Sequence, residues 1–155
     1  MSGWPAWGVN NFDNDGAMDF LSMQTMQLTA TITAVAADPG RLELDEDGET
    51  LFMPSVELLA LLCERYNAEP PRPAVVRQWH EKYLEAYDRG IDRLKPSPDF
   101  KAGRRKGIEN TFHAICAAVR DARRMVQETT NLLLVVVTDE SGNDDDFLEE
   151  TLRTL

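Results

Sequence analysis

The spacing of apolar residues in two long segments constrains the fold of this chain most. The segments cover residues 74–94 and, from about residue 102 or 104, residues up to about 127, and Pro96-Ser97-Pro98 separates them. Apolar residues recur in both segments at intervals of three and four, which is the pattern of an amphipathic helix with one buried face. Because the turn between the segments is short, we predict two long helices that pack antiparallel.

Two further helices are predicted in the N-terminal half. The first follows a capping residue, which can be Asp13, Asn14 or Asp15, and it ends before Asp38-Pro39-Gly40. The second begins near Pro54, a residue suited to a first helical turn, and runs to about residue 67. The predicted fold class is therefore mainly α, an irregular four-helix bundle.

A small β element, formed by residues 42–53 and 131–137, is left open by the sequence. Leucines alternate with polar residues at the start of the first segment and a turn-like Asp-Glu-Asp-Gly follows, so a short hairpin and a loose acidic loop fit equally well. The second segment can extend the helix before it, but its three successive valines are β-branched and favour a strand. Such a strand could pair with the region of Leu42 or Phe52.

The length of 155 residues fits one domain that is large enough to bury its own core. We expect a single helical domain over residues 1–138 and an acidic extension over residues 139–155, which can end in a short helix. No apolar run approaches the roughly 18 residues that a membrane span requires, and the first residues lack the pattern of a signal peptide. A cytoplasmic location is therefore expected, with Cys63 and Cys116 as buried free thiols.

The negative charge of the chain is unevenly distributed. Residues 1–64 carry a net charge of -10, residues 65–127 carry +6 and residues 128–155 carry -7, within a total of -11. Such a surface repels nucleic acids and anionic membranes and attracts basic proteins, although solubility alone explains it equally well. If a basic partner binds here, we expect it to contact the most acidic stretches, which contain Asp45, Glu46, Asp47, Asp144, Asp145 and Asp146.

Catalytic residue types form no recognisable set in the sequence. His80 opens a His-Glu pair like that of a zinc-protease helix, but Leu84 stands where the second histidine ligand would be needed. His113 and Cys116 lie three residues apart on a predicted helix, without a sign of the cleft and oxyanion donors that a catalytic dyad requires. We therefore predict no catalytic, cofactor-binding or metal-binding residues and no cofactor.

Two acidic stretches imitate calcium-binding loops, at residues 43–54 and 139–150. In the first, Pro54 occupies the position of the bidentate glutamate, and in the second, Asp144 replaces the turn glycine. We expect both to be solvated loops that can contribute to a binding face.

Basic residues gather around the turn between the two long helices. The cluster contains Arg89, Arg93, Lys95, Lys101, Arg104, Arg105 and Lys106. Cations at a helix N-terminus oppose the helix dipole, so we expect an acidic neighbour there, most simply the acidic loop of the same chain. Direct nucleic-acid binding is the weaker alternative, because no aromatic stacking surface adjoins the cluster.

The N-terminal segment contains Ala6-Trp7-Gly8, then Asn11-Phe12-Asp13-Asn14-Asp15-Gly16-Ala17-Met18-Asp19-Phe20. It resembles the opening of the bacterial domain-of-unknown-function family numbered 4259, whose members typically begin with Trp-Gly, an aromatic-acidic-Asn-Asp stretch and an Asp-aromatic pair entering a helix. The chain departs from that pattern in Val9-Asn10-Asn11, in the valine-rich segment and in the acidic tail. The resemblance implies no reaction, cofactor or catalytic residue.

The residues of this motif are expected to have a structural role. They are Trp7, Gly8, Phe12, Asp13, Asn14, Asp15, Asp19 and Phe20. In this interpretation Asp13 or Asp15 caps the first helix, Trp7 and Phe12 fix its entry, and Phe20 lies beneath.

The leading functional hypothesis is a non-enzymatic protein-binding domain, for example an immunity or inhibitor protein that neutralises a basic toxin or nuclease through its acidic surface. One alternative is a small hydrolase or ligand-binding enzyme whose carboxylates, such as Asp13, Asp15, Asp19 and Glu81, assemble in a cleft. Another is an acidic nucleic-acid mimic. The sequence leaves the partner's identity and the oligomeric state open, and it predicts no membrane contact.

Overall fold

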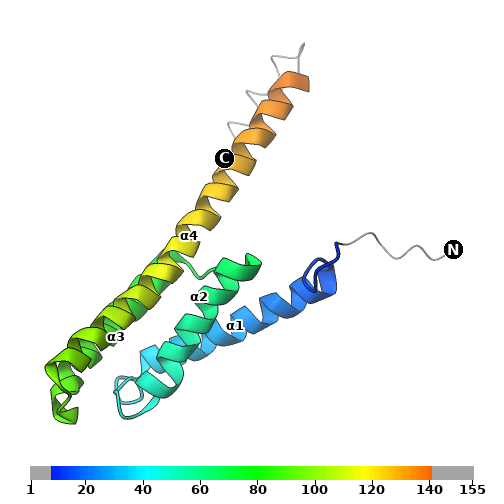
Figure 1. Cartoon of the computed structure of the whole chain (residues 1–155). Helices are drawn as coiled ribbons and strands as arrows, with labels where there is room; N and C mark the ends of the chain where they lie inside the picture. The colour runs from blue at the N-terminus through cyan, green and yellow to red at the C-terminus, as the bar shows by residue number, and fades with distance from the viewer. Residues whose placement is uncertain (1–7, 141–155) are drawn as a thin grey trace. The chain divides into compact units, whose positions relative to one another are not determined.

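Four α-helices and two short helical turns make up the described part of the chain (Figure 1). The structure is a computed structural model that describes the backbone of residues 8–140 and the side chains of residues 8–131. The elements are α1 (Asp15–Ala37), the π-helical turn η1 (Gly48–Phe52), α2 (Met53–Tyr66), α3 (Pro73–Gly90), the 3-10 turn η2 (Ile91–Leu94) and α4 (Pro98–Glu140). Contacts divide the chain into two units, residues 1–120 and residues 121–155, and each is considered by itself.

The helices begin and end at residues whose local chemistry favours a boundary. Asn14 is the N-cap of α1, and its Oδ1 accepts a hydrogen bond of 2.9 Å from the backbone N–H of Ala17. Proline lies in the first turn of α2 and of α3, where its missing N–H costs nothing. α2 ends at Asn67, whose left-handed backbone with φ of 54° lets the helix terminate in a tight turn.

The mainly α class is confirmed, but the hairpin, one of the two alternatives left open for residues 42–53, is wrong, whereas the loop alternative is right for residues 42–47. Residues 42–47 form turns that lead directly into η1. Leu42 and Leu44 are both buried, so their alternation reflects a loop folded onto the core. A side chain on Gly48 would overlap the carbonyl oxygens of Leu42 and Glu43, and only glycine permits this close approach of the backbone.

The strand expected at residues 131–137 is also wrong, because these residues continue α4. Adding a valine to an existing helix avoids the cost of nucleation and loses only roughly 0.7 kcal/mol or less per residue relative to alanine. The described residues 8–140 contain no other strand with which a strand here could pair. α4 also begins earlier than predicted, at Pro98, where the Ser97 hydroxyl accepts a hydrogen bond of 3.2 Å from the N–H of Phe100.

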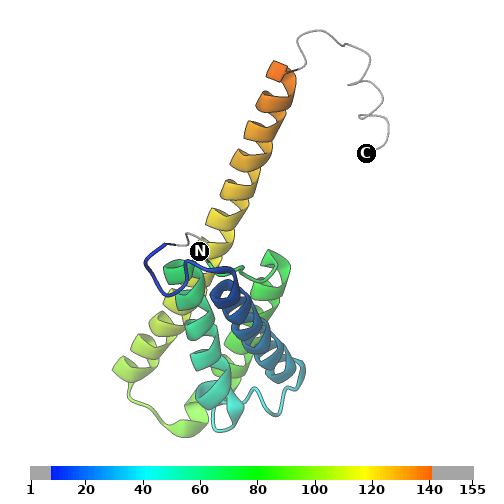
Figure 2. The same cartoon turned by 90° about the vertical axis from the view of Figure 1, so that its right-hand side faces the viewer.

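The core of the first unit is aromatic. Its largest fully buried side chains are Trp79, Tyr83, Tyr87, Phe52 and Phe112. The rings of Phe52 and Tyr83 are stacked with centroids 5.1 Å apart, which joins η1 to α3. α1 lies against α2 and α3 (Figures 1 and 2), so all the elements of this unit enclose one core.

The two long helices pack antiparallel, as predicted. The residue numbers rise along α3 while those of their partners fall along α4, since His80 contacts Glu109 whereas Asp88 contacts Arg105. None of the helices in the described part of the chain combines the length and the hydropathy needed to cross a membrane.

Candidate functional site

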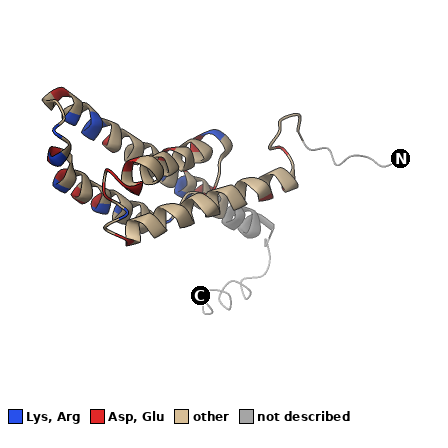
Figure 3. Ribbon diagram, turned by 90° about the horizontal axis from the view of Figure 1, so that it is seen from below, with Lys and Arg blue, Asp and Glu red and all other residues tan. Residues whose placement is uncertain are grey.

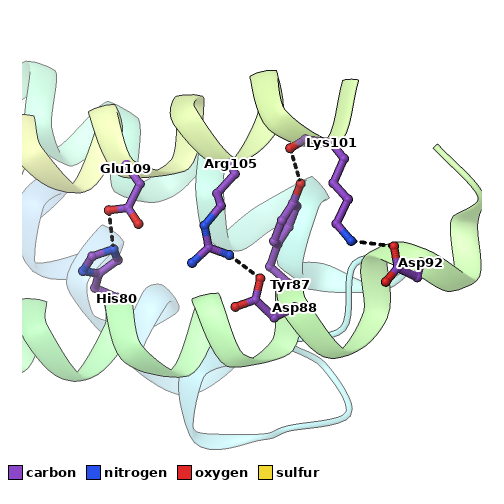
Figure 4. A network of polar contacts seen from close by, with 7 residues as sticks. All are labelled: His80, Tyr87, Asp88, Asp92, Lys101, Arg105 and Glu109. Carbon is purple, nitrogen blue, oxygen red and sulfur yellow. Dashed lines mark hydrogen bonds and ion pairs between the residues drawn. The ribbon is translucent and has the colours of Figure 1, made fainter. Parts of the chain in front are cut away.

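A ladder of polar contacts joins the end of α3 to the start of α4 (Figure 4). The Tyr87 hydroxyl donates a hydrogen bond of 2.8 Å to the carbonyl oxygen of Lys101. The ammonium group of Lys101 in turn lies 2.6 Å from Asp92 Oδ1, and Arg105 forms an ion pair with Asp88. These contacts fix the turn between α3 and α4, and they neutralise two members of the basic cluster within the same hairpin.

The acidic loop between α1 and η1 supplies further counter-charges to the cluster. Glu43 forms an ion pair with Arg93, and its Oε1 lies 3.6 Å from a guanidinium nitrogen of Arg89. Within the loop, Arg41 Nε lies 2.7 Å from Asp47 Oδ2. The basic cluster therefore has the acidic neighbour that the sequence predicted, and this neighbour belongs to the same chain.

Glu49 forms the most protected contact between the loop and the helices. Its carboxylate accepts a hydrogen bond of 2.5 Å from the Tyr83 hydroxyl and lies 2.7 Å from Arg104. Burial of the Tyr83 phenol and its hydrogen bond to the negatively charged Glu49 raise the pKa of that hydroxyl, despite the nearby guanidinium. Tyr83 therefore stays protonated and holds η1 against α3 and α4.

The residues predicted to bind a basic partner now separate into three groups. Asp47 is engaged by Arg41. Asp45 and Glu46 are exposed and form no ion pair within the described part of the chain. Asp144, Asp145 and Asp146 lie outside the described residues. Much of the acidity of this loop therefore stabilises the fold.

The two histidines have different environments. His80 Nε2 lies 3.0 Å from Glu109 Oε2 (Figure 4). The His80 ring also stacks on Phe112, with centroids 4.5 Å apart. His113 is exposed and has no hydrogen bond among the described side chains. Glu109 is the acidic residue nearest to His113 in the sequence, but it pairs with His80 across the α3–α4 interface.

The N-terminal motif is built around two short polar contacts. Asp13 Oδ2 accepts hydrogen bonds from the backbone and side-chain nitrogens of Asn10, at 2.8 and 2.9 Å. A side chain on Gly8 would overlap the Asp13 carboxylate, which explains the glycine. Of the three capping candidates, Asn14 is the cap, so the motif interpretation in which Asp13 or Asp15 caps the helix is wrong. Asp13 instead holds the turn that precedes the helix.

The aromatic residues of the motif also differ in their surroundings. Phe12 is partly buried and contacts the ring of Tyr66 with centroids 4.5 Å apart, so it fixes the entry to α1 as predicted. Phe20 was expected beneath the motif, but it is exposed, because its position on α1 lies away from the face that packs on α2 and α3. Asp15 and Asp19 are exposed as well, and Trp7 lies outside the described residues.

The exposed face of α1 is a surface that sequence reasoning missed. Phe20, Met23 and Met26 have 52%, 50% and 72% of their surface exposed. No charged residue occurs between positions 20 and 37, and Figure 3 accordingly shows this helix almost entirely in the colour of uncharged residues. This charge-free run was the available signal, because a helix face that only meets water normally contains charged residues.

A shallow hollow of about 460 Å³ lies along α2. Its lining consists of Leu58, Leu61, Leu62, Glu64, Arg65 and Tyr66. Leu58 and Leu61 are about half exposed, so α2 also presents apolar side chains to solvent.

The remaining groups with reactive chemistry are dispersed. Both cysteines are free, Cys63 buried and Cys116 partly buried, and burial raises the pKa of the Cys63 thiol to about 11. No three histidine, cysteine, aspartate or glutamate residues gather closely enough to hold a metal ion among the residues that the structure describes. Of the carboxylates considered for a hydrolase, Asp13 is occupied by Asn10, and Glu81 is exposed on α3.

The fold and its surfaces define a mainly α-helical domain with an exposed apolar helix face and a basic cluster in which Arg89, Arg93, Lys101, Arg104 and Arg105 pair with acidic residues of the same chain. The chain belongs to the family Domain of unknown function (DUF4259), whose model matches residues 5–154. No curated protein and no solved structure matches it significantly. The family resemblance found at the N-terminus is thus confirmed over nearly the whole chain.

Proposed function

We propose that this chain is a non-enzymatic protein-binding domain and that the exposed face of α1 contacts its partner. The observation that carries the proposal is the exposure of Phe20, Met23 and Met26 on a helix without a charged residue from position 20 to 37. Contiguous apolar surface on a small domain typically marks a protein contact. Methionine side chains are flexible and polarisable, so they adapt well to the surface of a partner.

The charges beside this face indicate the chemistry of the partner. Asp15 and Asp19 are exposed in the first two turns of α1, next to Phe20 in the sequence. The N-terminal 64 residues as a whole carry a net charge of -10. A partner with an apolar patch and a basic rim would therefore complement α1, with the charges accelerating the encounter and the apolar contacts supplying affinity.

The acidic loop supports a second candidate, the inhibitor of a basic toxin or nuclease. Asp45 and Glu46 are exposed and have no ion-pair partner within the described residues, whereas Glu43, Asp47 and Glu49 are paired. Two unpaired carboxylates in one loop can attract a cationic surface, although the attraction is screened by salt. This candidate requires the loop to dominate binding.

A pull-down with two variants distinguishes the two candidates. The first variant replaces Phe20, Met23 and Met26 with serine, and the second combines Asp45→Asn with Glu46→Gln. Each tagged protein is incubated with a lysate of the cells that produce the chain naturally, at low and at high salt, and captured proteins are identified by mass spectrometry. Circular dichroism confirms that both variants fold, which we expect because all five side chains are exposed.

The proposal predicts one captured protein that the α1 variant loses and the loop variant retains, with binding that persists at high salt. A protein lost by the loop variant and by high salt would instead support the inhibitor. Capture of the same proteins by the wild type and by the α1 variant would refute the role of α1.

A further inference from the structure

The apolar stripe that packs α4 into the core continues along the same helix after residue 120. Its positions follow one another at alternating intervals of four and three residues, and all but Thr129 are apolar: Ile108, Phe112, Ile115, Val119, Ala122, Val126, Thr129, Leu133 and Val136. The first four are buried in the core of the first unit. In the second unit, Val126 is 67% exposed and its neighbour Met125 is 58% exposed.

The continuation of this stripe is unusually apolar in its sequence. Residues 132–137 are six consecutive leucines and valines, and they belong to the helical part of α4. A helix that is apolar around its whole circumference is normally buried. Together with the exposed Met125 and Val126, this apolar run makes the helical segment 121–140 a candidate surface for association.

Charge and spacing indicate that this partner is a second copy of the chain. Residues 121–138 contain two acidic residues, Asp121 and Glu128, and two basic residues, Arg123 and Arg124, so their net charge is zero although the whole chain carries -11. Two copies would repel each other through their acidic stretches but not through this one. The alternation of four and three residues is the repeat that lets helices pair as a coiled coil.

We propose that the chain forms a homodimer in which residues 121–137 of two copies pair along this stripe. The dimer is independent of the proposed partner contact, which uses α1. It would present two copies of the α1 face, and so it would increase the avidity for any partner with more than one binding site.

The test compares two substitutions that introduce the same charge into the same helix. Val126→Asp places a carboxylate in the stripe, whereas Asn131→Asp places one outside it. The Asn131 side chain accepts a hydrogen bond of 3.0 Å from Gln127, and aspartate keeps that acceptor, so the control preserves the local contact. Both positions are exposed in the single chain, and neither substitution should disturb its fold.

Sedimentation equilibrium of the full chain over a wide concentration range gives the dissociation constants. We expect a reversible dimer for the wild type and for Asn131→Asp, and a dimer weakened by roughly a hundredfold or more for Val126→Asp, because a carboxylate would be buried without a partner. A wild-type chain that stays monomeric throughout, or equal association of the two variants, would overturn the proposal. Loss of the dimer in the α1 serine variant would overturn it as well, because association would then use α1.

Discussion

The hydroxyl of Tyr83 donates a hydrogen bond to Glu49 in a contact that joins α3 to the π-helical turn η1. Arg104 from α4 lies 2.7 Å from the same carboxylate, so one acidic residue connects three elements that are distant in the sequence. Tyr83 is completely buried, and this polar contact satisfies its hydroxyl in the middle of the aromatic core. The position of the acidic loop thus depends on a small number of directional contacts.

Replacement of this tyrosine by phenylalanine tests the contact. We expect Tyr83→Phe to lower the free energy of unfolding by roughly 1 to 3 kcal/mol, because the Glu49 carboxylate loses a hydrogen bond in a partly buried position. Urea denaturation followed by circular dichroism gives the value. Tyr66→Phe is the matched control, since Tyr66 is exposed at the end of α2, and it should change the free energy of unfolding by less than about 0.5 kcal/mol. Equal losses in the two variants would contradict the role of the Tyr83 hydroxyl.

Stability should decrease in alkaline solution. Burial raises the pKa of Cys63 from an ordinary value of 9.0 to about 11, so the folded state holds this proton more tightly than the unfolded state. The resulting stabilisation is complete below pH 9 and is lost as the pH rises through 11, by about 1 to 2 kcal/mol. The raised pKa of Tyr83 adds a loss of the same sign that begins near pH 10, the ordinary pKa of tyrosine.

Urea denaturation at a series of pH values checks this slope. Cys63→Ala should flatten the decrease between pH 9 and 10 and leave the part of the decrease above pH 10 that Tyr83 causes, whatever its effect on stability at neutral pH. Cys116→Ala serves as the control and should retain the wild-type slope, because Cys116 is less buried. An unchanged slope in Cys63→Ala would show that other groups cause the alkaline loss.

The two histidines should differ in their importance for stability. His80→Ala removes both the contact with Glu109 and the stacking on Phe112, and we expect a loss of roughly 1 to 2 kcal/mol. His113→Ala changes an exposed residue on the same pair of helices and should cost less than about 0.5 kcal/mol. Thermal denaturation of both variants at neutral pH measures the difference. A larger effect at His113 would contradict the arrangement of α3 and α4.

The first turn of α1 provides a local test of the N-terminal motif. Asn14→Ala removes the side chain that accepts from the N–H of Ala17, and we expect a loss of about 1 kcal/mol. Asn14→Asp should stay near the wild type, because aspartate caps a helix equally well and complements its dipole. Asp15→Asn should have a small effect, since Asp15 is not the cap. Chemical denaturation gives the free energy of unfolding of the three variants. The largest loss in Asp15→Asn would refute Asn14 as the N-cap.

The helices were largely predictable from the sequence because their boundaries depend on local chemistry. The apolar spacing of α3 and the prolines of α2 and α3 act over one or two turns, so they could be recognised without a structure. The errors concerned residues whose structure depends on distant contacts. Leu42 and Leu44 alternate as in a strand, yet the core that covers both of them comes from elements far along the chain.

The charged residues of the candidate site show the same difference between local features, which could be predicted, and distant contacts, which could not. The acidic and basic stretches were recognised, and their mutual neutralisation was predicted in outline. Residue spacing alone could not show which of Asp45, Glu46 and Asp47 are available to a partner. Asp47 is paired with Arg41, and such an ion pair depends on how the loop folds. The exposed face of α1 was missed because Phe20 was expected to lie beneath the N-terminal motif.

The sequence by itself determined the mainly α class, the positions of four helices and the membership of the family. Helical periodicity, capping residues and the family pattern can all be recognised in short stretches of the sequence. Only the tertiary structure decided which apolar residues are buried and which charges are neutralised. Burial and ion pairing depend on residues brought together from distant parts of the chain, as Glu49, Tyr83 and Arg104 are. For this reason Phe20, Met23 and Met26 became a candidate binding surface only when the packing of α1 was known.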